Sequence, residues 1–269
     1  MAGMHTDGAT RIVESADGTP IACWATGSGP PLVLLHGTAA DRTRWRPVLP
    51  ALRQHRTVYL VDRRGRGESG DADGYAIARE VEDVTAVIDA IGGPVELLGH
   101  SYGGLCALEA ALRTRNLRRL LLYEPPLRVA DELPATTLAE VERLVAEGRH
   151  EQALICFMRD MVQVPPHEVE LLRTRPSWPG RVAAAHTIPR ELRAVLDYRF
   201  DPERFAGLRI PTLLLLGGDS PGRLKRSTEA AHAALPHSRV AVMPGQQHAA
   251  MDTGTDLFTA EVIRFLTTP

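Results

Sequence analysis

The stretch VELLGHSYGG, residues 95–104, decides the fold, because an apolar run leads in it directly into the pattern Gly-x-Ser-x-Gly. The run has the length and apolar character of a strand buried on both faces, and residues 104–113 continue as a helical pattern. A serine between strand and helix lies on a sharp turn, which closes only if neighbours such as Gly99 and Gly103 lack side chains. The turn lifts the Ser101 hydroxyl off the sheet, at a helix N-terminus that favours negative charge. The stretch therefore predicts that Ser101 is a nucleophile.

Further apolar runs flank this stretch on both sides. Each is four to six residues long and ends at a polar, glycine or proline residue; they are residues 31–35, 57–61, 120–123, 212–216 and 239–243. Helical patterns lie between them, the clearest at residues 75–91 and 256–266, where apolar residues recur every three or four positions. A hairpin with strands at residues 11–15 and 20–25 precedes them. This alternation predicts an α/β fold with a mostly parallel, doubly wound sheet.

Residues 125–205 break the alternation, because no buried-strand pattern occurs in them. They contain helical stretches interrupted by prolines, at residues 138–147, 150–162, 168–173 and 189–198. An insertion of this size after the sixth strand is expected to form a helical cap over one edge of the sheet. We therefore predict a core domain of residues 1–126 and 206–269 and a cap domain of residues 127–205.

The composition excludes several classes of function. The chain has 269 residues, of which 44% are hydrophobic, and its 31 basic and 33 acidic residues nearly cancel. This balance provides no basic surface for nucleic acid or for a membrane. Residues 1–10 lack the features of a signal peptide, and no apolar run reaches about 18 residues. We expect a small-molecule substrate and a monomer or homodimer.

The cysteines indicate the cellular compartment. Cys23, Cys106 and Cys156 are too few and too scattered for a disulfide framework or a cysteine-based metal site. Buried free thiols are expected, and with them a reducing, cytoplasmic setting. No group of His, Cys, Asp and Glu has metal-ligand spacing, so no metal is predicted.

His248 is the predicted general base for Ser101, whose hydroxyl is a weak nucleophile until a base takes its proton. It lies in PGQQH, residues 244–248, after the last strand and before the last helix. Most other histidines fall in helical or cap segments, whereas His36 and His100 flank the predicted site without the spacing of a base.

The motif His36-Gly37-Thr38 follows the strand at residues 31–35 and predicts an oxyanion hole. A tetrahedral acyl intermediate carries negative charge on oxygen, which preorganised N–H donors stabilise. The backbone amides of Thr38 and of Tyr102, the residue after the nucleophile, are the expected donors.

Two carboxylates compete for the role of the acid that orients the imidazole. Asp219 follows the strand at residues 212–216, and Glu124 follows the strand at residues 120–123. Both lie at the carboxyl end of a strand, so their positions alone do not separate them.

The loop DRRGRGES, residues 62–69, is rich in glycine and arginine. It matches neither the phosphate-binding pattern G-x-x-x-x-G-K-[ST] nor G-x-G-x-x-G at the start of a helix. We interpret it as a structural turn.

Taken together, these segments resemble the α/β-hydrolase superfamily. The resemblance rests on His36-Gly37-Thr38, Asp62-x-Arg64-Gly65-x-Gly67-x-Ser69, Gly99 to Gly104, Pro211 to Asp219 and Gly245-x-x-His248, which follow one another in the family's order. It implies the α/β-hydrolase fold, a helical cap and catalysis without a cofactor. It does not identify the substrate, because this fold hosts many chemistries.

The resemblance also bears on the acid. In much of the family the acid lies three residues beyond the glycine that ends the strand matching residues 212–216, and that position here is Ser220. Some members, including haloalkane dehalogenases and a zearalenone-lactonase-like group, carry the acid after the strand matching residues 120–123, where Glu124 lies. We therefore predict Glu124 as the acid, with Asp219 as the alternate. Dehalogenases and epoxide hydrolases carry an aspartate at the position of Ser101, so both are disfavoured.

The predicted reaction is hydrolysis of an ester or lactone of a small, largely apolar molecule through an acyl-enzyme. Predicted substrate contacts are Gly37 and the cap residues Trp178 and Met158; Phe157, Met161 and Tyr198 are further candidates, and each cap residue could instead belong to the cap interior. The same residues could cleave a carbon–carbon bond or run perhydrolysis as in haloperoxidase-like members. An alternative of another class is a cofactor-free lyase or cyclase, or a ligand-binding protein.

Overall fold

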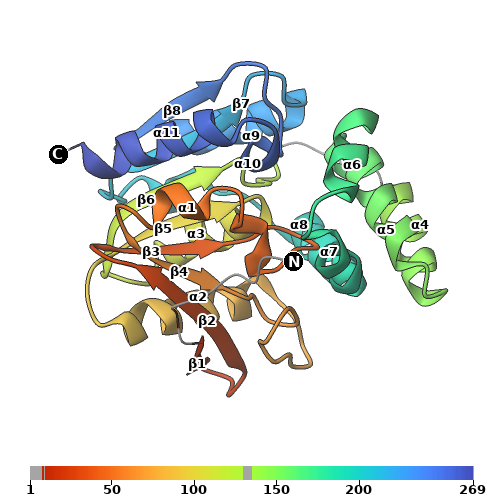
Figure 1. Cartoon of the computed structure of the whole chain (residues 1–269), viewed down its shortest axis with the longest axis horizontal. Coiled ribbons are helices and arrows are strands. Elements are labelled where there is room, and N and C mark those ends of the chain that lie inside the picture. Colours follow the sequence, from red (N-terminus) through yellow and green to blue (C-terminus); the bar gives the residue numbers. More distant parts are fainter. Residues whose placement is uncertain (1–7, 9, 130–134, 269) are drawn as a thin grey trace.

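A single eight-stranded sheet forms the centre of the molecule, which we describe from a computed structural model for residues 8, 10–129 and 135–268. The strands lie in the order β1-β2-β4-β3-β5-β6-β7-β8 (Figure 1). Their bounds are β1 (Thr10–Glu14), β2 (Pro20–Gly27), β3 (Pro31–Leu35), β4 (Thr57–Val61), β5 (Val95–His100), β6 (Leu117–Tyr123), β7 (Thr212–Gly217) and β8 (Ser238–Met243). From β4 to β8 in this order all pairings are parallel, whereas β2 pairs antiparallel with both β1 and β4.

Helices cover both faces of the sheet, because successive strand residues point to opposite faces. Val33 and Leu35 pack with α2 (Ile77–Ile91), α3 (Tyr102–Ala110) and α9 (Gly222–Ala234). Leu32 and Leu34 pack on the other face with α1 (Leu49–Leu52) and α11 (Thr255–Thr267), which α10 (Ala250–Thr253) precedes. All four strand residues are fully buried, which explains why their run is continuously apolar.

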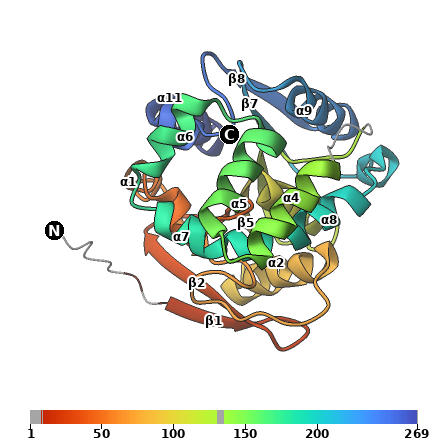
Figure 2. The ribbon, with the colours of Figure 1, turned by 90° about the vertical axis from the view of Figure 1, so that its right-hand side faces the viewer.

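A separate group of helices lies between β6 and β7 in the chain and to one side of the sheet (Figures 1 and 2). Its members are α4 (Ala135–Ala146), α5 (His150–Cys156), α6 (Pro166–Arg173), α7 (Trp178–Ala183) and α8 (Ile188–Asp197), with a π-helical segment over residues 157–162. They share a hydrophobic cluster of their own, which includes Ala39 and Ala249 from loops of the sheet domain. We call this group the cap helices.

The predicted fold class is confirmed, and the strands match their expected positions within a few residues. The helices α1, α7, α9 and α10 were not expected from the sequence. In α9 the buried positions are mostly small or polar, such as Ser227, Thr228 and Ala231, so no apolar periodicity marks it. The division into a core of residues 1–126 and 206–269 and a cap of residues 127–205 stays a prediction.

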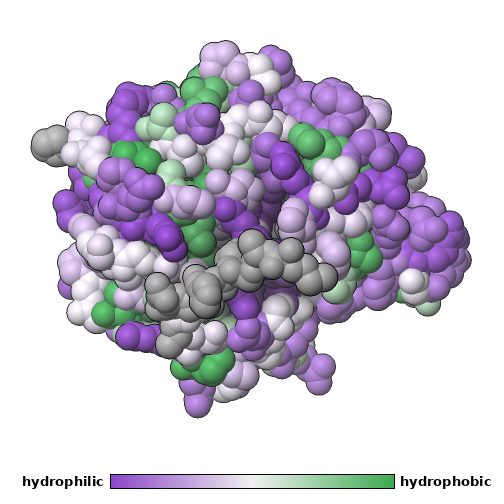
Figure 3. All heavy atoms as spheres, viewed as in Figure 1, coloured by the Kyte–Doolittle hydropathy of each residue, from purple (hydrophilic) through white to green (hydrophobic). Residues whose placement is uncertain are grey.

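The surface and the thiols agree with the composition. The face seen in Figure 3 is mostly hydrophilic, with hydrophobic residues in small groups. Cys23, Cys106 and Cys156 are buried and unbridged. Within the described residues, no helix is both long enough and apolar enough to cross a membrane. Most of the segment examined for a signal peptide lies outside the described residues.

Candidate active site

Ser101 lies on a sharp turn between β5 and α3. Its φ of 54° and ψ of −124° are a conformation that residues with a side chain rarely adopt. A Cβ atom at Gly99 would overlap the backbone of residues 103 and 104, and a Cβ atom at Gly103 would overlap that of residues 35 and 36. The Ser101 N–H donates to the carbonyl oxygen of Tyr123 at 2.8 Å, which holds the turn against β6. The two glycines therefore allow α3 to start directly above the strand ends.

Glu124 and His248 form a close pair beside this turn. Oε2 of Glu124 lies 2.5 Å from Nδ1 of His248. The other oxygen, Oε1, accepts the N–H of Gly217 at 2.8 Å and the hydroxyl of Ser220 at 2.5 Å. Glu124 is fully buried at the end of β6, and its partners Gly217 and Ser220 lie at and after the end of the neighbouring strand β7. Three donors thus fix this carboxylate in one orientation toward the imidazole.

Asp219, the alternate acid, lies apart from this pair. Its side chain is exposed, and its backbone N–H donates to the carbonyl oxygen of Gln246 at 2.9 Å. Within the described residues no hydrogen bond or ion pair joins its carboxylate to His248. The geometry therefore favours Glu124 over Asp219.

The loop that carries His248 is anchored by buried aromatic residues. The Tyr123 hydroxyl donates to the carbonyl oxygen of Gln247 and accepts the N–H of Ala250 at 3.2 Å. Nε2 of His100 lies 3.0 Å from the carbonyl oxygen of His248, and the two imidazole rings are 4.6 Å apart between centroids. Burial holds the pKa of His100 well below its usual value, and the neighbouring Arg44 acts in the same direction. The neutral ring of His100 therefore supports the loop without competing for the proton.

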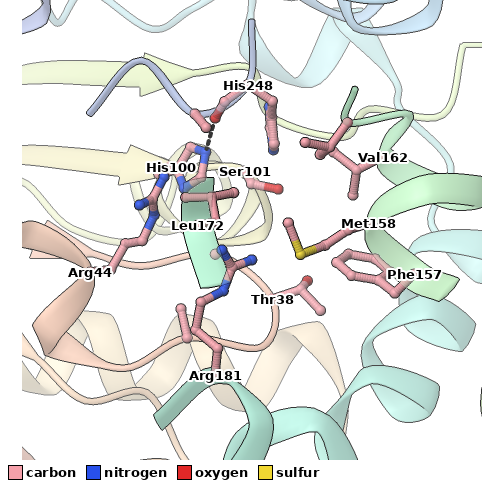
Figure 4. A pocket seen from close by; sticks show the side chains of 14 residues that line it. Thr38, Arg44, His100, Ser101, Phe157, Met158, Val162, Leu172, Arg181 and His248 are labelled. Atoms are coloured by element: carbon pink, nitrogen blue, oxygen red, sulfur yellow. Dashed lines mark hydrogen bonds between the residues drawn. The ribbon is translucent and has the colours of Figure 1, made fainter. Parts of the chain in front are cut away.

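A cavity of about 40 Å³ separates the turn from the cap helices. Ser101 and His248 both line it, and the imidazole of His248 points toward the Ser101 hydroxyl (Figure 4). The cap side is lined by Phe157, Met158, Val162, Val164 and Leu172. The cap residues therefore lie directly across the cavity from the serine.

The two amides predicted to form the oxyanion hole lie next to residues of the cavity, since Thr38 lines it and Tyr102 follows the lining residue Ser101. Tyr102 is the first residue of α3, so its N–H has no partner inside the helix. No described residue accepts the backbone N–H of either one. Gly37 lies close to the nucleophile, because a Cβ atom added there would come within 2.9 Å of Cβ of Ser101.

Of the predicted substrate contacts, the structure brings Gly37, Met158 and Phe157 to the cavity. Trp178 and Met161 pack instead inside the cap cluster, where the indole N–H of Trp178 donates to Glu151 at 3.0 Å. The Tyr198 hydroxyl donates to Glu109 at 2.7 Å, away from the cavity. Large side chains at cap positions were thus a poor guide to the lining, because they also fill the cap interior.

Two lining residues that the sequence did not single out are Arg44 and Arg181. Arg44 comes from a 3₁₀ turn at residues 42–45, and Arg181 comes from α7. Neither belongs to a motif, and only the packing of α7 over the strand ends brings the two together.

The arginines of the loop at residues 62–69 are engaged inside the protein. Arg63 forms ion pairs with Glu80 at 2.7 Å and with Glu191 of α8 at 2.6 Å. Arg64 pairs with Asp83 at 2.7 Å, and Arg66 pairs with Glu191. The loop is therefore a structural turn that also ties α8 to the sheet domain.

Comparison with known proteins identifies the family of the chain. A model described as the alpha/beta hydrolase family matches residues 32–261. The chain is 29% identical over 236 residues to a pimeloyl-(acyl-carrier protein) methyl ester esterase of Aeromonas hydrophila, covering 83% of this chain and 90% of the relative.

Two solved structures are similar over nearly their whole length. An alpha/beta hydrolase from Sphaerobacter thermophilus DSM 20745 has a TM-score of 0.83 and 38% identity, covering 96% of this chain and 100% of that chain. An esterase from Rhodococcus sp. ECU1013 has a TM-score of 0.75 and 25% identity, covering 96% of this chain and 98% of that chain.

Proposed function

The chain belongs to the alpha/beta hydrolase family and is an enzyme, and from this premise we propose that it hydrolyses carboxylic esters or lactones through an acyl-enzyme on Ser101. The observation that carries the proposal is the alignment of Glu124, His248 and Ser101 at one end of the sheet. Oε2 of Glu124 lies 2.5 Å from Nδ1 of His248, whose ring points toward the Ser101 hydroxyl (Figure 4).

In the first half of the reaction, Ser101 becomes acylated. His248 takes the hydroxyl proton through Nε2 as Oγ of Ser101 attacks the ester carbonyl carbon. Glu124 stabilises the imidazolium through Nδ1–H, and the amides of Thr38 and Tyr102 hold the oxyanion. His248 then gives the proton to the leaving oxygen, the carbon–oxygen bond breaks, and an alcohol departs.

In the second half, water restores the serine. His248 takes a proton from water, whose oxygen attacks the acyl carbon, and the same amides hold the second oxyanion. The bond to Oγ of Ser101 breaks, Oγ receives the proton from His248, and a carboxylic acid leaves. Oxygen ester chemistry is further supported by two similar proteins described as esterases.

A fluorophosphonate probe tests the nucleophile directly, because it reacts with an activated serine and not with an ordinary hydroxyl. We expect the probe to attach to the peptide that contains Ser101, as read by mass spectrometry. Ser101→Ala should lose labelling and lower the kcat for a simple methyl ester by roughly 10⁴-fold or more. Ser177→Ala, in the cap and outside the cavity lining, is the matched control and should keep both. Labelling at another residue, or full turnover by Ser101→Ala, would contradict the proposal.

A further inference from the structure

Arg181 is a cation of the active-site cavity for which the described residues provide no counter-ion. Its guanidinium group points from α7 into the cavity beside Thr38 and Met158 (Figure 4). Its Nε donates to the carbonyl oxygen of Ala39 at 3.2 Å. Within the part of the chain that the structure describes, no carboxylate forms an ion pair with it.

The carboxylates in the neighbourhood, which are Asp41, Glu168 and Asp252, form no ion pair with Arg181 within the described residues. Asp252 pairs with Arg44, and its other oxygen lies 3.9 Å from Nε of Arg175. Asp41 lies beside Gly180, but its Oδ1 accepts the N–H of Thr43 at 2.7 Å, and no ion pair joins it to Arg181.

Arg181 is therefore the lining residue whose charge is not paired within the part of the chain that the structure describes. The lining also holds Arg44, which pairs with Asp252, and the imidazoles of His100 and His248, but no aspartate or glutamate. Burial lowers the pKa of Arg181 to about 9, with the positive charge of Arg44 acting in the same direction, so the guanidinium still carries its charge at neutral pH. Arg181 is half-buried, so it has lost part of its water, and an anion or hydrogen-bond acceptors in the cavity would compensate that loss. Arg181 has one backbone carbonyl, and the remaining N–H donors face the cavity in which Ser101 acts.

We propose that Arg181 binds a carboxylate of the substrate, so that the enzyme prefers esters bearing a carboxylate a few bonds from the scissile carbonyl, such as monoesters of short dicarboxylic acids. This inference rests on the proposed ester hydrolysis at Ser101. The planar guanidinium fork matches a carboxylate in two parallel hydrogen bonds, and Arg181 lines the same cavity as Ser101, so that a short chain could join the two groups of the substrate. Phe157, Met158 and Val162 line the apolar part of the cavity, where the methylene groups would pack. This proposal adds an anionic end to the small, largely apolar substrate expected from the sequence.

The test compares esters that differ only in this group. Monomethyl succinate is matched by methyl butyrate, and monomethyl glutarate by methyl valerate, with acid release followed in a pH-stat. In the wild-type enzyme we expect kcat/KM to be higher for the anionic ester of at least one pair, by roughly 10- to 100-fold, the range of a charge-assisted hydrogen bond. A ratio near one or below for both pairs would overturn the inference and leave ester hydrolysis intact.

Variants separate charge recognition from a structural role of Arg181. Arg181→Gln should lower the ratio of anionic to neutral kcat/KM toward one, and Arg181→Lys should keep part of it. An equal loss on both esters would show that Arg181 only holds α7 in place, which contradicts the inference. Arg193→Gln, an exposed arginine of α8 paired with Glu142, is the matched control and should leave the ratio unchanged.

A binding measurement distinguishes failure of this inference from failure of ester hydrolysis. Calorimetry of Ser101→Ala with monomethyl glutarate and monomethyl succinate needs no turnover. We expect binding of at least one that weakens at least tenfold when Arg181→Gln is added to Ser101→Ala. If the wild type hydrolyses no ester yet this binding is seen, the proposed reaction is wrong and the anion site stands. If neither anion binds, or if adding Arg181→Gln does not weaken the binding, the proposal of an anion site at Arg181 is wrong.

Discussion

At the residue scale, Ser101 and Glu124 are unusual because both have a positive φ angle. Their φ angles are 54° and 46°, in the left-handed region that residues with a side chain rarely occupy. Such a conformation costs about 1–3 kcal/mol and persists only where the surroundings impose it. Here backbone hydrogen bonds impose it, from Ser101 N–H to Tyr123 at 2.8 Å and from Glu124 N–H to Leu215 at 3.3 Å. Nucleophile and carboxylate are therefore both aimed by the sheet.

Exchange of the two candidate acids for amides belongs to this scale. Glu124→Gln should lower kcat by roughly 10²- to 10⁴-fold, because an amide neither stabilises the imidazolium nor holds the right tautomer. Asp219→Asn should stay within a few-fold of wild type, since its side chain is exposed and away from His248. Steady-state kinetics of both variants on one ester measures the two values of kcat. A loss of turnover in Asp219→Asn alone would assign the acid to Asp219.

Residues that follow a recognisable strand could be singled out from the sequence, and those without such a signal could not. Ser101 and His248 were named from strand ends and chain order, whereas Glu124 was preferred to Asp219 through the family resemblance; all three stay predictions. Arg44 and Arg181 stayed hidden because their roles depend on how α7 packs over the strand ends. An arginine in a cap helix is ordinarily a surface residue, so no local signal distinguishes Arg181 from Arg193.

Close contact between α3 and β3 is the main packing constraint at the element scale. Gly103 allows it, because a Cβ atom there would overlap the carbonyl oxygens of residues 35 and 36. Gly103→Ala should therefore lower the free energy of unfolding by about 1–3 kcal/mol, measured by urea denaturation, and lower kcat by displacing the Tyr102 N–H. Gly93→Ala, whose added Cβ would have no atom within 4 Å, should stay within about 0.5 kcal/mol of wild type. Equal stability of both variants would contradict this account of the turn.

The attachment of α8 to the sheet domain gives a second prediction at this scale. Glu191 is fully buried and pairs with Arg63 at 2.6 Å and with Arg66. Glu191→Gln should lower the free energy of unfolding by about 3 kcal/mol, because two buried guanidinium groups then share fewer carboxylates. Glu142→Gln breaks only the exposed pair with Arg193 and should cost less than about 1 kcal/mol. Equal losses in the two variants would show that Glu191 is not a buried anchor.

Elements with strong apolar periodicity were predictable, and short or polar ones were not. The runs that became β3 to β7 are apolar on both faces because helices bury both sides of the sheet there, whereas Val242 of the edge strand β8 is exposed. The helix α7 is only six residues long and contains Pro179 and Gly180, so no periodicity develops in it. It nevertheless supplies Arg181, which shows why the lining of a cap escapes sequence analysis.

At the scale of the whole molecule, two buried histidines should make stability depend on pH. His36 lies 2.9 Å from the carbonyl oxygen of Gly37 through Nδ1, and its Nε2 accepts the N–H of Arg63 at 3.1 Å, which requires the neutral ring. Burial holds the pKa of His36 and that of His100 well below their usual values. Below about pH 6.5 the unfolded chain therefore binds more protons than the folded protein, so stability falls as pH falls.

The expected slope is roughly 1.4 kcal/mol per pH unit for each histidine in that window. Urea denaturation between about pH 7.5 and pH 5 measures it. His36→Gln should reduce the slope, whereas His55→Gln, an exposed residue, should leave it unchanged. If His36→Gln leaves the change of unfolding free energy with pH as it is in the wild type, His36 does not contribute to the pH dependence of stability.

The hydrogen bond between Ser220 and Glu124, 2.5 Å long, also bears on how this chain can evolve. A carboxylate introduced by Ser220→Asp would enter the same buried space as that of Glu124, and two like charges there disfavour each other's ionisation. Positions 124 and 220 are therefore epistatic. An acid at 220 is harmful while Glu124 is present, and it becomes useful only once Glu124 has been lost. A change from an acid at position 124 to an acid at position 220 would therefore pass through a protein with lowered activity.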